Sequence, residues 1–91
     1  MFNKLKQFKD LRNQAKTLQA ALAQESVQYE KSGINIAMNG NLEITSLTIS
    51  PDITREKLPG AVTETVNETI KRAQKVMAKK VQEMGGLSGF N

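Results

Sequence analysis

The chain has 91 residues, enough for one small domain whose own core is only marginally sufficient for stability. Cysteine and histidine are both absent, which excludes disulfides, thiolate zinc sites and the commonest general base and metal ligand. An excess of 13 Lys and Arg over 9 Asp and Glu gives a net charge of +4 and favours an anionic partner.

The N-terminal segment, residues 1–25, predicts a basic helix from about residue 3 onward. Its apolar residues recur at steps of three and four, the narrow seam of a helix with one buried side. They are Phe8, Leu11, Ala15, Leu18 and Leu22. Cations crowd the first half of the helix, where they oppose the helix dipole, so local stability does not explain them. A functional role and an ordinary solvated face are equally good explanations for Lys4, Lys6, Lys9, Arg12 and Lys16.

Residues 26–51 predict a small antiparallel sheet with one buried face. Apolar and polar residues alternate across residues 34–38, the period-two pattern of a half-buried strand. Residues 39–41, with the sequence Asn-Gly-Asn, interrupt this alternation and are typical of a hairpin turn. A further short alternation at residues 27–29 adds a third strand, and a sheet of this size needs a cover on one side.

Side-chain parity predicts the length of the hairpin loop. A three-residue loop at residues 39–41 pairs Met38 with Leu42 and Ile36 with Ile44, which collects these apolar side chains on one face. A two-residue loop would send Leu42 and Ile44 to the opposite face. Because a shift of one residue reverses every side chain, burial should select the odd-length loop.

After this hairpin the apolar residues change from even to odd positions, at Leu47 and Ile49. A β-bulge near residues 45–46 would return both side chains to the buried face. The sheet should end at residues 50–52, because Pro51 cannot donate a hydrogen bond to a strand ladder.

A second, longer helix is predicted over residues 59–84, with Pro59 at its first position. Its apolar seam consists of Val62, Val66, Ile70, Ala73, Met77, Val81 and Met84. Acidic residues lie toward its start and basic residues toward its end, as the helix dipole favours, and Glu68 can pair with Arg72. An ordinary solvated face therefore explains the second basic cluster better than a binding role does. This cluster is Lys71, Arg72, Lys75, Lys79 and Lys80. Residues 85–91 should form a flexible tail.

Element lengths predict a homodimer. At about 1.5 Å per residue the helices reach on the order of 33 and 39 Å, whereas a seven-residue strand covers only about 23 Å. Both helices must therefore extend beyond the sheet and carry apolar residues that nothing in the chain covers, which a symmetric partner would bury. The residues predicted at this interface are Phe8, Leu11, Leu18, Val66, Met77 and Val81.

The order of these features resembles the YbaB/EbfC family of bacterial nucleoid-associated DNA-binding proteins. The similarity covers nearly the whole chain and includes the opening MF with its Lys- and Gln-rich helix. It continues through AMNGNLEITSLTISPDI and LPGAVTETVNETIKRAQKVMAKKVQEMGGLSG. The resemblance implies an α+β fold with an α-β-β-β-α protomer, a homodimer with protruding helices, and DNA binding directed mainly to the phosphate backbone.

The resemblance also implies a location at the nucleoid and a role in DNA contact for the ten cations of the two clusters. These are Lys4, Lys6, Lys9, Arg12, Lys16, Lys71, Arg72, Lys75, Lys79 and Lys80. No preferred DNA sequence follows, because no recognition helix is visible in the sequence.

An enzyme is the first competing class, and the sequence disfavours it. Catalysis needs a nucleophile, a base or a metal in a pocket, and without His or Cys only Lys, Tyr29 and carboxylates could serve. Glu64 and Glu68 form a carboxylate pair at helical spacing, but neighbouring cations would neutralise them. We therefore expect no catalytic residues, no cofactor, no metal and no small-molecule substrate.

The second competing class is a structural or chaperone-like helical module that binds a protein partner. Its support is the apolar helix ends, including Met77 and Met84, since methionine adapts to varied partner surfaces. A dimer core explains the same residues better. A membrane role is disfavoured because the apolar stripes are needed for packing, and we expect a cytoplasmic protein without a signal peptide.

Overall fold

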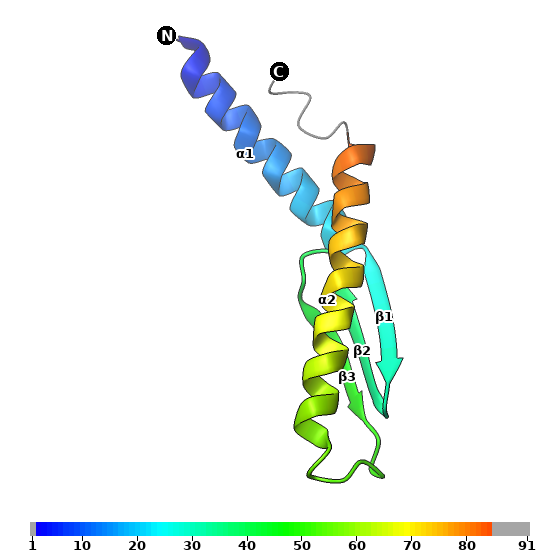
Figure 1. Ribbon diagram of the computed structural model, residues 1–91. Coiled ribbons are helices and arrows are strands. Elements are labelled where there is room, and N and C mark those ends of the chain that lie inside the picture. Colours follow the sequence, from blue (N-terminus) through cyan, green and yellow to red (C-terminus); the bar gives the residue numbers. More distant parts are fainter. Residues whose placement is uncertain (1, 85–91) are drawn as a thin grey trace.

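The computed structural model describes residues 2–84, with side chains from Lys6 onward, and shows two helices and a three-stranded sheet (Figure 1). The elements are α1 (Phe2–Ala23), β1 (Ser26–Lys31), β2 (Ile34–Asn39), β3 (Ile44–Ile49) and α2 (Leu58–Glu83). This order confirms the predicted α-β-β-β-α chain, and helix α2 begins one residue before Pro59. The flexible tail predicted for residues 85–91 lies outside the described residues.

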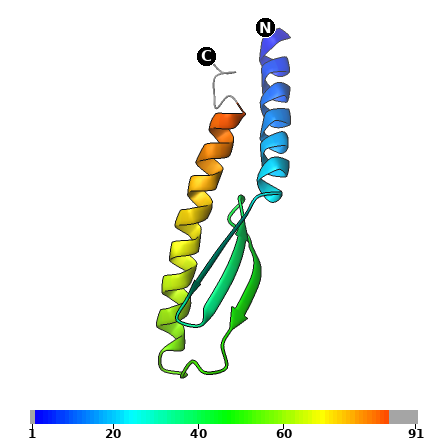
Figure 2. The ribbon, with the colours of Figure 1, turned by 90° about the vertical axis from the view of Figure 1, so that its right-hand side faces the viewer.

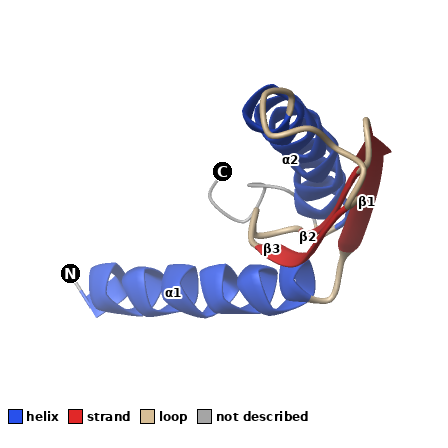
Figure 3. Cartoon of the chain, turned by 90° about the horizontal axis from the view of Figure 1, so that it is seen from below, coloured by secondary structure: helices blue, strands red, loops and turns tan. Residues whose placement is uncertain are grey.

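The sheet is antiparallel with the strand order β1-β2-β3, and α2 packs on one of its faces, over β1 and β2 (Figure 2). Ile34, Ile36 and Met38 of β2 are buried beneath the helix. Both α1 and the C-terminal part of α2 extend past the same end of the sheet, and α1 points away from the rest of the chain (Figure 3). The predicted extension of both helices beyond the sheet is therefore confirmed.

The hairpin between β2 and β3 has the predicted parity but a different register. Met38 pairs with Ile44 rather than with Leu42, and Ile36 pairs with Leu47 rather than with Ile44. The predicted partner was therefore wrong by two residues at Met38, and by three at Ile36, where the extra residue of a bulge adds one. A shift of two residues leaves each side chain on its own face, so the parity argument itself holds.

The side chain of Asn39 explains the shift in register. Its Oδ1 accepts hydrogen bonds from the backbone N–H groups of Asn41 at 2.9 Å and Glu43 at 3.1 Å, a local turn that asparagine favours. The backbone N–H of Asn39 donates to the carbonyl oxygen of Glu43 at 3.0 Å, so Asn39 remains in the strand. The three loop residues are consequently 40–42, and Leu42 takes a positive φ of 64°.

The predicted bulge is confirmed, because the register changes between the Ala37–Ser46 and Met38–Ile44 pairs and leaves Thr45 as the extra residue. It places Leu47 and Ile49 on the same face as Ile34 and Ile36, the face on which α2 packs.

The expected burial of the β3 side chains was wrong for the single chain. Ile44 is 48% exposed, Leu47 49% and Ile49 43%. Their exposure follows from the width of one helix. An α-helix is about 10–12 Å across and strands lie about 4.8 Å apart, so α2 covers two strands and leaves the third open.

The buried face of α2 also differs from the predicted seam. Thr65, Thr69 and Ala73 are the buried residues of this helix, and of these only Ala73 belongs to the predicted seam. The Thr65 hydroxyl donates to the carbonyl oxygen of Ala61, and the Thr69 hydroxyl to that of Thr65, both at 2.7 Å. Both hydroxyls have acceptors within the helix, and Thr65 Oγ1 also lies 3.5 Å from the carbonyl oxygen of Lys31 in β1, so these threonines are buried without unsatisfied polar groups. The remaining seam residues from Val62 to Val81 are half-buried beside this face.

The loop at residues 40–42 also fixes the end of α1. The last carbonyl groups of a helix lack partners within it. Here Leu22 O accepts a hydrogen bond from the Gly40 N–H at 2.9 Å, and Gln19 O, which lies one turn earlier in the helix, accepts a second contact from Asn41 Nδ2 at 3.0 Å. The Leu22 side chain is buried, so the hairpin anchors the base of α1.

Gly40→Ala should loosen this anchor, because an added Cβ would lie 2.9 Å from Leu22 O and 2.8 Å from Leu22 Cδ2. We expect a loss of about 1–3 kcal/mol in the free energy of unfolding, the usual cost of overpacking. Gly60→Ala is the matched control, since nothing lies within 4 Å of its new Cβ and alanine favours a helix by about 0.5–1 kcal/mol. Urea unfolding of both variants checks this, and equal stabilities would contradict the anchor.

Ile36→Ala should destabilise the protein by about 2–5 kcal/mol, the cost of truncating a fully buried aliphatic side chain. Asn35→Ala, on the opposite face of β2, removes one exposed hydrogen bond from Gln28 and should cost about 1 kcal/mol or less. Thermal or urea denaturation measures both variants. Similar losses at the two positions would show that the core does not lie between β2 and α2.

Candidate nucleic-acid interface

An exposed apolar surface runs along β3 and the adjoining flank of α2. The orientation of α2 follows from its contacts with β1: Glu64 forms an ion pair with Lys31, and Arg72 lies over the Tyr29 ring. The flank that carries Glu64 therefore faces β1, and at about 100° per residue the opposite flank faces β3. We call this region the β3 apolar surface, and it consists of Ile44, Leu47, Ile49, Val66, Ile70 and Met77.

Helix α1 also carries apolar side chains that the described chain leaves uncovered. Phe8 is 62% exposed and Leu11 38% exposed, and the helix meets α2 only near its base (Figure 1). The other predicted interface residues are Leu18, Val66, Met77 and Val81, and all four are half-buried. The sequence missed the contribution of β3 to this exposed apolar area, because alternation alone does not show how many strands a helix covers.

The predicted basic residues of α1 are exposed where the structure describes them. Lys9, Arg12 and Lys16 follow steps of three and four, so they fall within about 60° of one another around the helix. We call them the α1 basic stripe. Lys6 is exposed to one side of it, and the side chain of Lys4 lies outside the described residues.

The predicted basic cluster of α2 divides into two groups. Lys71, Lys75 and Lys79 are exposed at steps of four residues, and we call them the α2 basic stripe. Arg72 and Lys80 instead have partners within the chain. Arg72 lies 4.6 Å from the centre of the Tyr29 ring, and its Nε is 3.7 Å from Glu68 Oε1, which confirms the predicted pair. Lys80 Nζ lies 3.0 Å from Glu25 Oε1 and 3.7 Å from Glu83 Oε2.

Two lysines are held in their charged form by carboxylates. The hydrogen bond to Glu64, together with its negative charge, raises the pKa of Lys31. Glu25 raises the pKa of Lys80 in the same way. Because both folded-state pKa values lie above the ordinary 10.5, the stabilisation is fully present below that pH and is lost as the pH rises through the raised values. Both lysines are therefore charged at neutral pH.

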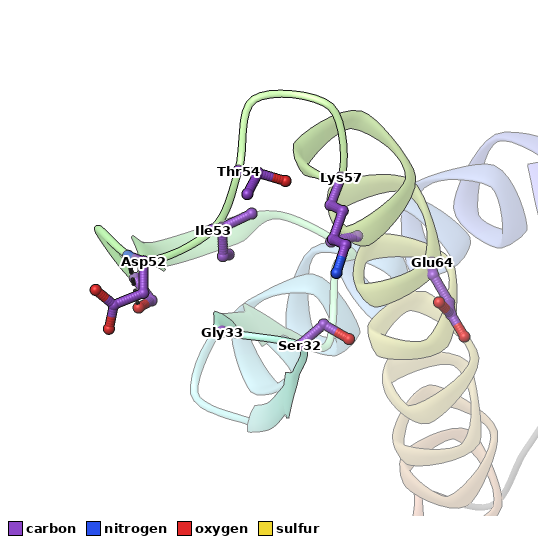
Figure 4. Close-up of a pocket in the computed structure, with 9 residues that line it drawn as sticks. Ser32, Gly33, Asp52, Ile53, Thr54, Lys57 and Glu64 are labelled. Carbon is purple, nitrogen blue, oxygen red and sulfur yellow. Dashed lines mark hydrogen bonds between the residues drawn. The ribbon is translucent and has the colours of Figure 1, made fainter.

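An open pocket of about 510 Å³ lies at the far end of the sheet from α1, between the β1–β2 turn and the segment before α2 (Figure 4). Asp52 and Glu64 stand on opposite sides of it, and Glu64 is already paired with Lys31. Its carboxylates therefore do not converge on a common point. Within residues 2–84 no group of three or more acidic residues is arranged to hold a metal ion.

Comparison with known proteins identifies the family of this chain. Among residues 2–84 no helix is both long enough and apolar enough to cross a membrane. A nucleoid-associated protein of Caldanaerobacter subterraneus is 27% identical over 98% of this chain and 84% of its own length. One from Thermoanaerobacter pseudethanolicus is 28% identical over 94% of this chain and 84% of its own length. One from Chloroflexus aurantiacus is 30% identical over 88% of this chain and 87% of its own length. The sequence model of the YbaB/EbfC DNA-binding family matches residues 1–88, and the chain belongs to this family.

Proposed function

We propose that this protein is a homodimeric nucleoid-associated protein that binds double-stranded DNA mainly through the phosphate backbone, with weak sequence preference. The observation that carries the proposal is the pair of exposed basic stripes on the two helices, in a chain that belongs to a DNA-binding family. We further propose that it acts at the nucleoid in the cytoplasm, where it contributes to nucleoid organisation and gene expression.

The β3 apolar surface supports the proposed dimer. It joins an edge strand with three exposed apolar side chains to a half-buried helix flank, and a soluble chain of this size gains stability by covering such a surface. A second copy offers the same surface, so a two-fold axis would bury both at once. Exposed Phe8 and Leu11 of α1 extend the area that a partner can cover.

The kind and number of the cations support binding to the DNA backbone. Lysine outnumbers arginine by 10 to 3, and lysine contacts phosphate as a point charge, whereas arginine excels at bidentate recognition of guanine. Two chains at +4 each give a dimer with a charge of about +8. Such a dimer can neutralise several phosphates along a duplex without contacting base edges.

A competition gel shift tests the proposed weak sequence preference. The protein is bound to one labelled duplex and then displaced with unlabelled duplexes of equal length and unrelated sequence. We expect all competitors to displace the label within about threefold of one another, because backbone contacts carry no sequence information directly. A competitor that is a hundredfold stronger than the others would contradict backbone-directed binding.

The second candidate is a structural or chaperone-like module that binds a protein partner, and the exposed Phe8 on the protruding α1 favours it. Apolar contacts respond weakly to salt, whereas phosphate contacts weaken steeply as salt rises. Suppose the protein showed no affinity for duplex DNA at low salt and remained a monomer with the β3 apolar surface open. The second candidate would then replace the first.

A further inference from the structure

A shallow groove of about 760 Å³ lies along the flank of α2 that faces away from β3, beside the edge strand β1. Val27 of β1 and Val76 of α2 contribute apolar atoms to it. Its polar lining combines cations with amides and a single acid: Gln28, Glu68, Lys71, Arg72, Gln74 and Lys75. The groove therefore joins part of the α2 basic stripe to the sheet.

Arg72 is held in this groove by two contacts of different kinds. Its guanidinium lies over the face of the Tyr29 ring, 4.6 Å from the ring centre, where the quadrupole of the ring attracts a cation. Its Nε faces Glu68 Oε1 at 3.7 Å. The side chain is nevertheless half exposed, and its contact with Glu68 is through Nε rather than through the outer pair of guanidinium nitrogens. That pair has the spacing that recognises two oxygens of one phosphate.

The charges of the groove favour a long anionic polymer. Lys71, Arg72 and Lys75 against Glu68 leave the groove with two net positive charges. Lys79 continues the row one helical turn further, and steps of four residues advance about 6 Å along the helix. Each strand of a duplex carries one phosphate per about 3.4 Å of helix axis, so its backbone can offer a phosphate to the cation at each step.

We propose that this groove between β1 and α2 seats the phosphate backbone of duplex DNA, with Tyr29 as the positioning residue that presents Arg72 to a phosphate. The proposal rests on the DNA binding proposed above and assigns it a place on the chain. The groove faces away from the β3 apolar surface, so dimer formation through that surface leaves both copies of the groove open.

Four single substitutions test this proposal by fluorescence anisotropy with a labelled duplex. Arg72→Lys keeps the charge but removes the paired donors, and Tyr29→Leu removes the ring. We expect each to weaken binding about tenfold, the loss of one charge-assisted hydrogen bond. Tyr29→Phe keeps the ring face and should bind within about twofold of the parent. Arg55→Lys makes the same exchange in the segment before α2 and should also bind like the parent.

The slope of log affinity against log salt separates positioning from charge. It should stay at the parent value for Arg72→Lys and Tyr29→Leu, because neither changes the number of charges. For Arg72→Gln it should fall by about 0.9 for each groove that contacts the duplex. Residue Arg72 lies on an exposed surface of α2, so the Arg72→Lys variant should fold, and circular dichroism verifies this.

Three results would overturn the proposal. The first is a parent that binds DNA while Arg72→Lys and Tyr29→Leu bind equally well. The second is loss of binding in Tyr29→Phe equal to that in Tyr29→Leu. The third is tighter binding of a polyglutamate peptide than of the duplex by the parent, lost in Arg72→Lys, which would assign the groove to an acidic protein partner. A parent that binds no DNA would instead contradict the proposed function itself.

Discussion

Leu47→Asp is expected to convert the proposed dimer into a folded monomer. Leu47 is 49% exposed in the single chain, so an aspartate there stays in water and the protomer keeps its core of β2 and α2. In the dimer the same carboxylate would be buried without a partner, at a cost of several kcal/mol. Because about 1.4 kcal/mol is a factor of ten, the dimer should weaken by at least about a hundredfold.

Sedimentation velocity at micromolar concentration measures this effect. The parent should sediment with about twice the chain mass of 10.1 kDa, and the Leu47→Asp variant with that mass itself. Thr48→Asp is the matched control, since it adds the same charge to the next residue of β3, on the opposite face of the sheet. A parent that is already a monomer, or equal dissociation in both variants, would show that the β3 apolar surface is not the interface.

Charge reversal of the α1 basic stripe is expected to abolish DNA binding. In the variant with Lys9, Arg12 and Lys16 all changed to Glu, each chain goes from a net charge of +4 to −2. All three residues are exposed, so the fold and the dimer should remain intact. Loss of three phosphate contacts, with repulsion in their place, should weaken binding by several orders of magnitude at low salt. Gel shifts and sedimentation measure both properties.

The companion variant reverses Lys71, Lys75 and Lys79 of the α2 basic stripe and reaches the same net charge. Two double variants separate the effect of position from that of overall charge. One carries Lys9→Glu and Lys16→Glu, and the other carries Arg55→Glu and Lys57→Glu. Each of them has a net charge of zero. The first double variant should lose binding and the second should keep most of it. If both triple variants bind DNA like the parent, the stripes are only solvated surface and the proposed function is wrong.

The sequence predicts the elements of this chain well, because each carries a periodicity that only one structure satisfies. Parity likewise predicts the odd-length hairpin loop and the extra residue Thr45, since each shift by one residue would move apolar side chains to the wet face. The register itself depends on the Asn39 side chain, which accepts hydrogen bonds from two backbone N–H groups. The side chain of an asparagine in a turn can accept hydrogen bonds from several backbone N–H groups, so the apolar pattern alone does not determine the register.

The errors at the core and at the basic clusters have different physical causes. Threonine counts as polar in a sequence pattern, yet Thr65 and Thr69 are fully buried because their hydroxyls are satisfied inside the helix. The pair of Glu68 and Arg72 could be predicted because its members are four residues apart on one helix. The ion pair of Lys80 with Glu25 joins distant parts of the chain, so only the fold shows that Lys80 already has a partner.

The salt dependence of DNA binding tests the central claim most directly. Affinity of the parent protein for two duplexes of unrelated sequence is measured by fluorescence anisotropy over a range of salt concentrations. We expect log affinity to fall linearly with log salt by about 0.9 for each phosphate contacted, with the same slope and similar affinity for both duplexes. A slope near zero, or binding of only one duplex, would contradict a homodimer that holds DNA by its phosphate backbone.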